Sequence, residues 1–148
     1  MFILDPTAAP ATRFLRSASA VKDTDRRPGQ KEGHMSDDLF VKIINREIPA
    51  DIVFETDEVL AFRDINPQAP THFLIIPKEP IRTINDIQHE HAELVGRLFL
   101  AAAELARQEG IAEEGYRVVM NCNRAGGQAV YHIHLHLLGG RQMEWPPG

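Results

Sequence analysis

Three histidines alternate with apolar residues near the carboxyl end of the chain, in the segment AVYHIHLHLLGG at 129–140. His132, His134 and His136 are three of the seven histidines in 148 residues. A neutral imidazole is a nucleophile, a base and a metal ligand near pH 7. On an extended strand the three rings would share one face, spaced by about 6.8 Å. The row therefore has the residue types and the spacing of a reactive site.

The residues alone leave three interpretations of this row open. The first is a structural row of hydrogen-bonded histidines. The second is a zinc site, although no Cys-X-X-Cys or His-Glu-X-X-His pattern supports it. The third is covalent catalysis, in which the central histidine attacks phosphorus while its neighbours donate to phosphate oxygens. Gly126 and Gly127 precede the row and favour the third interpretation, because glycine lets backbone N–H groups approach a phosphate closely.

Strands and helices around the row follow from the spacing of apolar residues. Short apolar runs bounded by turn residues or proline predict strands over 51–55, 59–63, 71–76 and 116–120, and alternating side chains predict a last strand over 128–138. The last strand would pack one apolar face on a long helix, through Ala129, Tyr131, Ile133, Leu135 and Leu137. That order of elements predicts an α+β fold with a mostly antiparallel sheet of about five strands, one short helix and one long helix.

Both helices have start and stop signals. Asp37 or Asp38 would cap the short helix, and Pro49 would end it. Asn85 or Asp86 would open the long helix at about 87–109, and Gly110 would close it. The apolar face of the long helix would consist of Leu94, Val95, Leu98, Phe99, Ala102 and Leu105.

Composition limits the class of protein. With 43% apolar and 25% charged residues the chain is globular, and its net charge of −5 argues against a nucleic-acid partner. No apolar run is long enough to span a membrane. The single cysteine, Cys122, excludes an internal disulfide and fits a cytoplasmic location.

The chain divides at about residue 34. Residues 1–34 are rich in Ala, Pro, Ser and Thr and carry six Lys/Arg against four Asp/Glu, which predicts a disordered extension. An organellar targeting role for 1–34 is the less favoured interpretation. Residues 35–148 are expected to form one domain with a carboxyl-terminal tail.

The run GGQAVYHIHLHLLGGRQMEWPPG resembles the histidine triad motif, His-φ-His-φ-His-φ-φ with φ apolar. With DINPQAPTHFLIIPK upstream, the tail is similar to the Hint branch of that superfamily, and the resemblance covers about residues 36–148. It implies a homodimer, with the sheet extended across the two subunits. It also implies hydrolysis of purine nucleoside phosphoramidates, such as adenosine 5′-monophosphoramidate, and of aminoacyl adenylates, through a nucleotidyl-histidine and without a metal or cofactor.

The resemblance also implies roles for single residues. His134 would be the nucleophile, His132 would orient the other histidines, and His72 would stand behind them. The phosphate would contact His136, Gln128 and the backbone at Gly127 and Ala129, and Asn121 would lie near ribose and phosphate. Asp64 would bind the ribose hydroxyls, with Ile65 beside it. The base pocket would be lined by Phe40, Ile43, Phe62 and Ile65. Trp145 would approach the site of the partner subunit.

Three residues depart from the family pattern. Ala129 stands where Ser or Thr is frequent, which predicts a lower rate or a changed leaving-group preference. Pro80 and Glu144 each replace a histidine found in some members. Two other activities remain open: a nucleotide-binding regulator or scaffold with weak turnover, and a hydrolase of dinucleoside polyphosphates.

Overall fold

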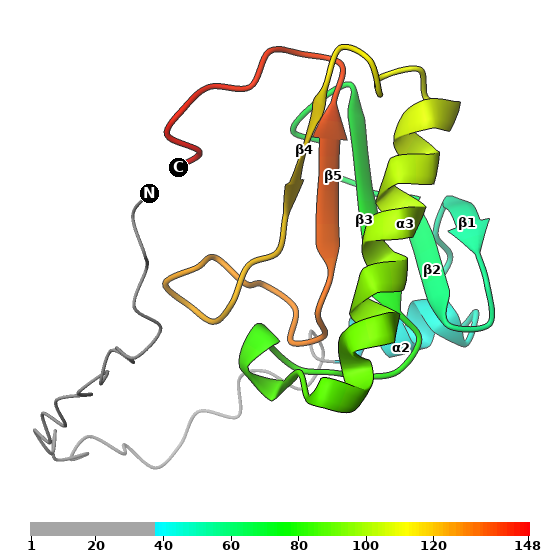
Figure 1. Ribbon diagram of the computed structural model, residues 1–148. Helices are drawn as coiled ribbons and strands as arrows, with labels where there is room; N and C mark the ends of the chain where they lie inside the picture. The colour runs from blue at the N-terminus through cyan, green and yellow to red at the C-terminus, as the bar shows by residue number, and fades with distance from the viewer. Residues whose placement is uncertain (1–37) are drawn as a thin grey trace, which may run out of the picture. The chain divides into compact units, whose positions relative to one another are not determined.

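The computed structural model describes residues 38–148, so Asp37 and the extension predicted at 1–34 lie outside the described residues. A short helix is followed by three strands, a long helix and two further strands (Figure 1). The elements are α2 (Leu39–Ile44), β1 (Ile52–Glu55), β2 (Val59–Arg63), β3 (Thr71–Pro77), the 3-10 turns η1 (Ile84–Asp86) and η2 (His89–His91), α3 (Ala92–Gln108), β4 (Tyr116–Val119) and β5 (Leu135–Gly139).

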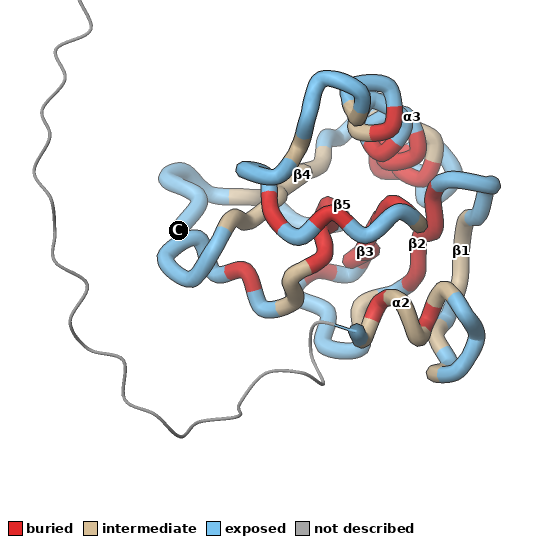
Figure 2. Tube along the Cα trace, turned by 90° about the horizontal axis from the view of Figure 1, so that it is seen from below, coloured by how far each residue is buried: buried red, intermediate tan, exposed pale blue. Residues whose placement is uncertain are grey.

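The five strands form one antiparallel sheet in the order β1-β2-β3-β5-β4. Figure 2 looks along the sheet and shows α3 on one face and α2 on the other. This arrangement confirms the predicted fold class. It also leaves β4 and β1 as the two edges of the sheet in the described part of the chain.

Alternating side chains of the strands fill two separate apolar layers. On the α3 face, residues such as Phe73, Ile75 and Leu135 pack against Leu98 and Leu105 of the helix. The other face packs against α2 through the cluster Phe40, Ile43, Leu60, Phe62, Leu74 and Ile76. His72 and His136 occupy alternate positions of β3 and β5 on the α2 face.

Both helices are shorter than the sequence predicts. α2 ends at Ile44, five residues before Pro49, where Arg46 takes a positive φ of 63°, and the Asp38 side chain makes no cap hydrogen bond. α3 begins at Ala92 rather than 87, because η1 and η2 precede it and Thr83, not Asn85 or Asp86, caps η1. Gly110 does close α3, with φ 71°.

The largest correction concerns the last strand, which begins at Leu135 rather than 128. Extending the observed register, in which Ile75 pairs with Leu135, would place Pro77 opposite Ile133. Proline has no N–H to donate, so the ladder stops there. Instead, the Ile133 N–H donates to the Ile81 carbonyl at 2.7 Å. Ala129 is consequently exposed and Tyr131 half-buried, although Ile133, Leu135 and Leu137 reach the α3 core as predicted.

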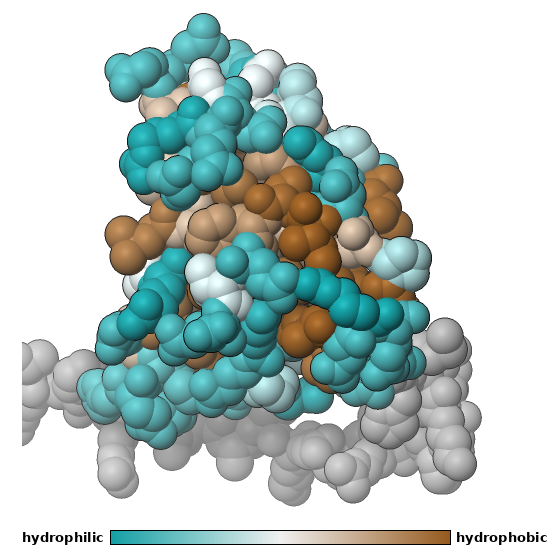
Figure 3. Space-filling view, turned by 90° about the vertical axis from the view of Figure 1, so that its right-hand side faces the viewer, coloured by the Kyte–Doolittle hydropathy of each residue, from teal (hydrophilic) through white to brown (hydrophobic). Residues whose placement is uncertain are grey.

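No helix within residues 38–148 is long and apolar enough to cross a membrane. Figure 3 shows the side of the domain on which apolar residues gather between hydrophilic ones. A groove of about 340 Å³ lies between α3 and the β1–β2 hairpin, lined by Phe54, Val59, Arg97, Leu100 and Glu104, among others. Phe99 was predicted to be part of the buried face of α3, but its side chain is 52% exposed.

Candidate active site

His132 is held inside the α2 layer and is only 1% exposed. Its Nε2 lies 2.7 Å from the Pro77 carbonyl oxygen, so Nε2 carries the proton and donates it. Its Nδ1 is a buried acceptor without a partner in the described part of the chain. The rings of Phe40 and His132 meet edge to face at 5.7 Å. The structure therefore gives His132 a supporting position beneath the other histidines.

His134 has the opposite arrangement of its ring nitrogens. Its Nδ1 lies 2.7 Å from the carbonyl oxygen of His132, which can only accept, so the proton is on Nδ1. Nε2 keeps its lone pair. The ring is 5% exposed and packs edge to face on Phe40 at 5.1 Å. His134 thus presents a neutral nitrogen nucleophile that neighbouring groups orient.

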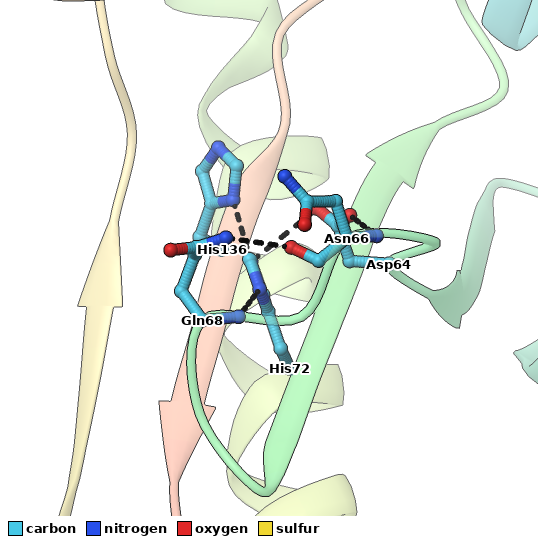
Figure 4. A network of polar contacts seen from close by, with 5 residues as sticks. All are labelled: Asp64, Asn66, Gln68, His72 and His136. Carbon is cyan, nitrogen blue, oxygen red and sulfur yellow. Dashed lines mark hydrogen bonds and ion pairs between the residues drawn. The ribbon is translucent and has the colours of Figure 1, made fainter.

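His136 is linked to His72 across the β3–β5 pair, as Figure 4 shows. The Gln68 N–H donates to His72 Nδ1 at 3.1 Å, so the His72 proton lies on Nε2. That atom is 2.9 Å from His136 Nδ1 and 3.5 Å from Asp64 Oδ2. His136 Nδ1 must accept, and its proton is therefore on Nε2. The rings of His134 and His136 are 5.0 Å apart, one with a bare Nε2 and one with a protonated Nε2.

Burial lowers the pKa of all four histidines, because the imidazolium cation loses solvation. The pKa of His136 falls to about 4, since the neighbouring His134 and His72 add to the effect of burial and Asp64 offsets it only in part. For His134, the carbonyl of His132 and the Asp64 carboxylate oppose burial without cancelling it. His134 and His136 are consequently both neutral at pH 7.

The loop between β4 and β5 is held by hydrogen bonds within the loop and by one to Arg82, which lies between β3 and η1. The Gln128 amide nitrogen donates to the carbonyls of Arg82 (2.7 Å) and Val130 (3.1 Å), and its oxygen accepts from the Asn123 N–H (2.8 Å). The Gly127 N–H donates to the Arg124 carbonyl at 3.0 Å. The Gln128 side chain therefore ties this loop to the segment that follows β3. The expected contact of Gln128 and the Gly127 backbone with phosphate stays a prediction.

Gly126 is required for this loop, since a Cβ there would lie 2.4 Å from the Cys122 carbonyl oxygen. Asn121 is half-buried and lies two residues beyond Val119, which pairs with His136, so it stands beside the triad. Ala129 is exposed on the segment that leads into the histidines. Pro80, Glu144 and Trp145 are also exposed, the last two in the tail.

The residues expected to line a base pocket divide into two groups. Phe40, Ile43 and Phe62 are buried in the α2 layer, where Phe40 and Phe62 meet edge to face at 5.6 Å. Ile65 is fully exposed beside the half-buried Asp64. The Asp64 carboxylate accepts from the Asn66 N–H at 2.8 Å, which fixes its direction. Phe40, Ile43 and Phe62 are therefore core residues, and Ile65 is the exposed apolar side chain of the set. That these four residues line a base pocket stays a prediction.

Asp64, His72 and His136 could also be considered as metal ligands, because their ligand atoms lie within 4.8 Å of one another. The donor types suit zinc. However, the lone pair of His136 Nδ1 already accepts the His72 Nε2 proton, and His72 Nδ1 accepts from Gln68. A resident ion would have to displace the hydrogen bond between the two rings. The arrangement does not fit a metal centre.

Two partners of the site were not found from the sequence: the backbone N–H of Gln68 and the carbonyl of Pro77. Every residue type supplies a backbone carbonyl, and all except proline supply an N–H, so the sequence does not show which of these groups bind a side chain. The proline at position 77 did indicate where strand pairing stops.

The comparisons with known proteins agree with this geometry. The HIT domain family model matches residues 45–143. Purine nucleoside phosphoramidase of Escherichia coli (strain K12) is 63% identical over 105 residues, which cover 71% of this chain and 88% of that protein. A 14 kDa zinc-binding protein of Zea mays is 56% identical, over 74% of this chain and 87% of that protein. A HIT family hydrolase structure from Legionella pneumophila Philadelphia 1 has a TM-score of 0.73 and 62% identity, over 74% and 98% of the two chains.

Proposed function

Because this chain belongs to the HIT domain family, we propose that it hydrolyses the P–N bond of purine nucleoside phosphoramidates through a covalent nucleotidyl-histidine. The observation that carries the proposal is the opposite protonation of two adjacent rings. His134 offers a bare Nε2 for attack, and His136 offers an N–H for the phosphate oxygens. The name of the Escherichia coli relative supports this substrate class.

In the first step, the Nε2 lone pair of His134 forms a bond to the α-phosphorus, and the bond from phosphorus to nitrogen breaks. The leaving amine takes up a proton from solvent. His136 Nε2–H donates to a phosphoryl oxygen, whose charge increases in the transition state. Water then attacks the same phosphorus, the bond to His134 breaks, and the nucleoside monophosphate leaves.

The nucleoside would be held by the β2–β3 loop. A carboxylate is a strong acceptor for ribose hydroxyls, and Asp64 is fixed in direction by the Asn66 N–H. Ile65 beside it supplies an exposed apolar side chain for the base. Asn121, next to the triad, is placed for a contact with ribose or phosphate.

The direct test is turnover of a fluorogenic adenosine phosphoramidate with and without a chelator. We expect turnover that the chelator leaves unchanged, because no step of the proposed reaction uses a metal ion. A protein that binds AMP without turnover would support the regulator alternative. Faster cleavage of a dinucleoside polyphosphate would support the other hydrolase. Loss of activity with the chelator would revive the metal interpretation at Asp64, His72 and His136.

We also propose that the protein is a cytoplasmic homodimer that continues its sheet through β4. Among the described strands, β4 is paired on one side only, and an unpaired edge is a template for a second copy. Arg97 and Glu104 of α3 line the groove towards β1 and β2. Helix geometry puts the half-exposed Phe99 on the opposite flank, towards β4. The β4 edge and Phe99 would thus both belong to the surface that makes the two-fold contact.

We expect Phe99→Glu to raise the dimer dissociation constant by about 100-fold or more, because it buries a charge in an apolar contact. The matched control is Leu100→Glu, whose parent residue is 69% exposed on the other flank of the same helix and which should stay dimeric. Sedimentation equilibrium measures both. A dimeric Phe99→Glu variant, or dissociation by both substitutions, would contradict this surface.

A further inference from the structure

The proton on His136 is set by a chain of contacts that begins outside the histidines. His136 Nδ1 accepts from His72 Nε2, and the His72 proton lies on Nε2 because the Gln68 N–H donates to Nδ1. A backbone N–H cannot accept a proton or exchange roles. One peptide N–H therefore fixes the tautomers of two rings in sequence (Figure 4).

Gln68 lies on an exposed loop, so its N–H needs support of its own. Its side-chain nitrogen donates to the Asn66 carbonyl at 3.0 Å, which folds the loop on itself. Its carbonyl oxygen accepts from Arg141 Nε at 3.1 Å. The two peptide groups on either side of the Gln68 Cα are thus held from opposite sides, one by His72 and one by Arg141.

Arg141 is the second residue after β5, the strand that carries His136, and the intervening Gly140 packs closely on the loop. Gly140 has a φ of 83°, and a Cβ there would lie 3.0 Å from Cβ of Pro70 on the same loop. Arg141 Nη1 also donates to the Gln142 carbonyl at 3.1 Å, which orients the guanidinium. A charged, planar donor with a fixed direction holds a carbonyl more firmly than a neutral side chain does.

We propose that Arg141 is a positioning residue for the reaction: by holding the Gln68 carbonyl, it fixes the N–H that sets the tautomers of His72 and His136. With the other tautomer, His136 would turn a lone pair towards the anionic phosphate and repel it. The proposal rests on the phosphoramidase function for its kinetic consequence, although the tautomers themselves do not depend on it.

The test compares Arg141→Ala with Arg141→Lys and Gln142→Ala. Gln142 is the matched control, because it is a neighbouring exposed tail residue whose side chain donates to the Met143 carbonyl and, within residues 38–148, to no group of the histidine site. For Arg141→Ala we expect kcat on a phosphoramidate to fall about tenfold with little change in KM, since misplacement of a donor costs transition-state stabilisation. Arg141→Lys should restore part of the rate, and Gln142→Ala should retain it.

Long-range ¹H–¹⁵N spectra of the histidine rings give a readout that a merely structural role would not change. The wild type should show both His72 and His136 protonated on Nε2, and Arg141→Ala should show mixed tautomers. If kcat falls while the tautomers stay as in the wild type, or if neither changes, Arg141 is not a positioning residue. If the wild type has no phosphoramidase activity, the proposed function fails, and the spectra still decide on Arg141.

Discussion

Replacement of His134 by Ala should reduce turnover of an adenosine phosphoramidate by about a thousandfold or more. The variant loses the Nε2 lone pair that attacks phosphorus, and loss of a nucleophile has effects of this order. The Nδ1 hydrogen bond to the His132 carbonyl and the contact with Phe40 are lost as well, so folding must be checked by thermal unfolding. In a rapid-quench experiment, the wild type should carry one adenylyl group on His134 and the variant none.

Two controls make this result specific. His89→Ala removes an exposed histidine on η2 and should leave the rate unchanged. Imidazole added to the His134→Ala variant should recover part of the activity, because the missing ring leaves space for an external nucleophile. A folded variant with more than a tenth of the wild-type rate would show that another group attacks phosphorus.

Acid should destabilise the protein well before most carboxylates titrate. The unfolded chain takes up a proton on each histidine near pH 6.5, whereas burial lowers the pKa of His72, His132, His134 and His136 in the folded chain. Between these values the unfolded state binds more protons, so stability is complete above about pH 6.5 and falls as the pH approaches the folded values. For His136 this interval reaches about pH 4.

We expect the free energy of unfolding to fall by about 3 kcal/mol between pH 7 and pH 4.5, after a discount because His136 is only partly buried. Urea unfolding at both pH values and one protein concentration measures it, since dimerisation also shifts stability. His136→Asn should lessen the loss, and His89→Gln should not. An unchanged pH dependence in His136→Asn would mean that carboxylates dominate.

The sequence predicts the arrangement of the fold well, because each layer has its own periodicity. The mostly apolar runs 59–63 and 71–76 predict strands covered on both faces, and both were found within one residue. The resemblance to the histidine triad family is also confirmed. Alternation was misleading in 128–134, where His-φ-His continues the pattern but the partner strand ends in Pro77. Local patterns cannot show where a partner stops offering N–H groups.

The sequence predicted which residues belong to the site better than it predicted their protonation states. The residue types indicate that His134 and His136 act together, but their protonation depends on the carbonyl of His132 and the N–H of Gln68, which any residue would supply. Likewise, the sequence does not show that the Gln128 side chain donates to the carbonyls of Arg82 and Val130. The sequence predicts the same role for Ile65 and Phe40, as apolar residues lining a base pocket. Only the folded structure shows that Ile65 is exposed and Phe40 buried.

Pro77 lies where the β3–β5 pairing ends, next to the histidines of the site. Because the β3–β5 ladder ends at the pair Ile75–Leu135, the Pro77 carbonyl is free to accept from His132, whose ring meets Phe40 edge to face. A residue with an N–H at position 77 would favour a longer, regular strand, and the histidines would then project at uniform intervals like ordinary strand side chains. Pro77 thus shapes the segment that carries His132 and His134 without taking part in the chemistry itself.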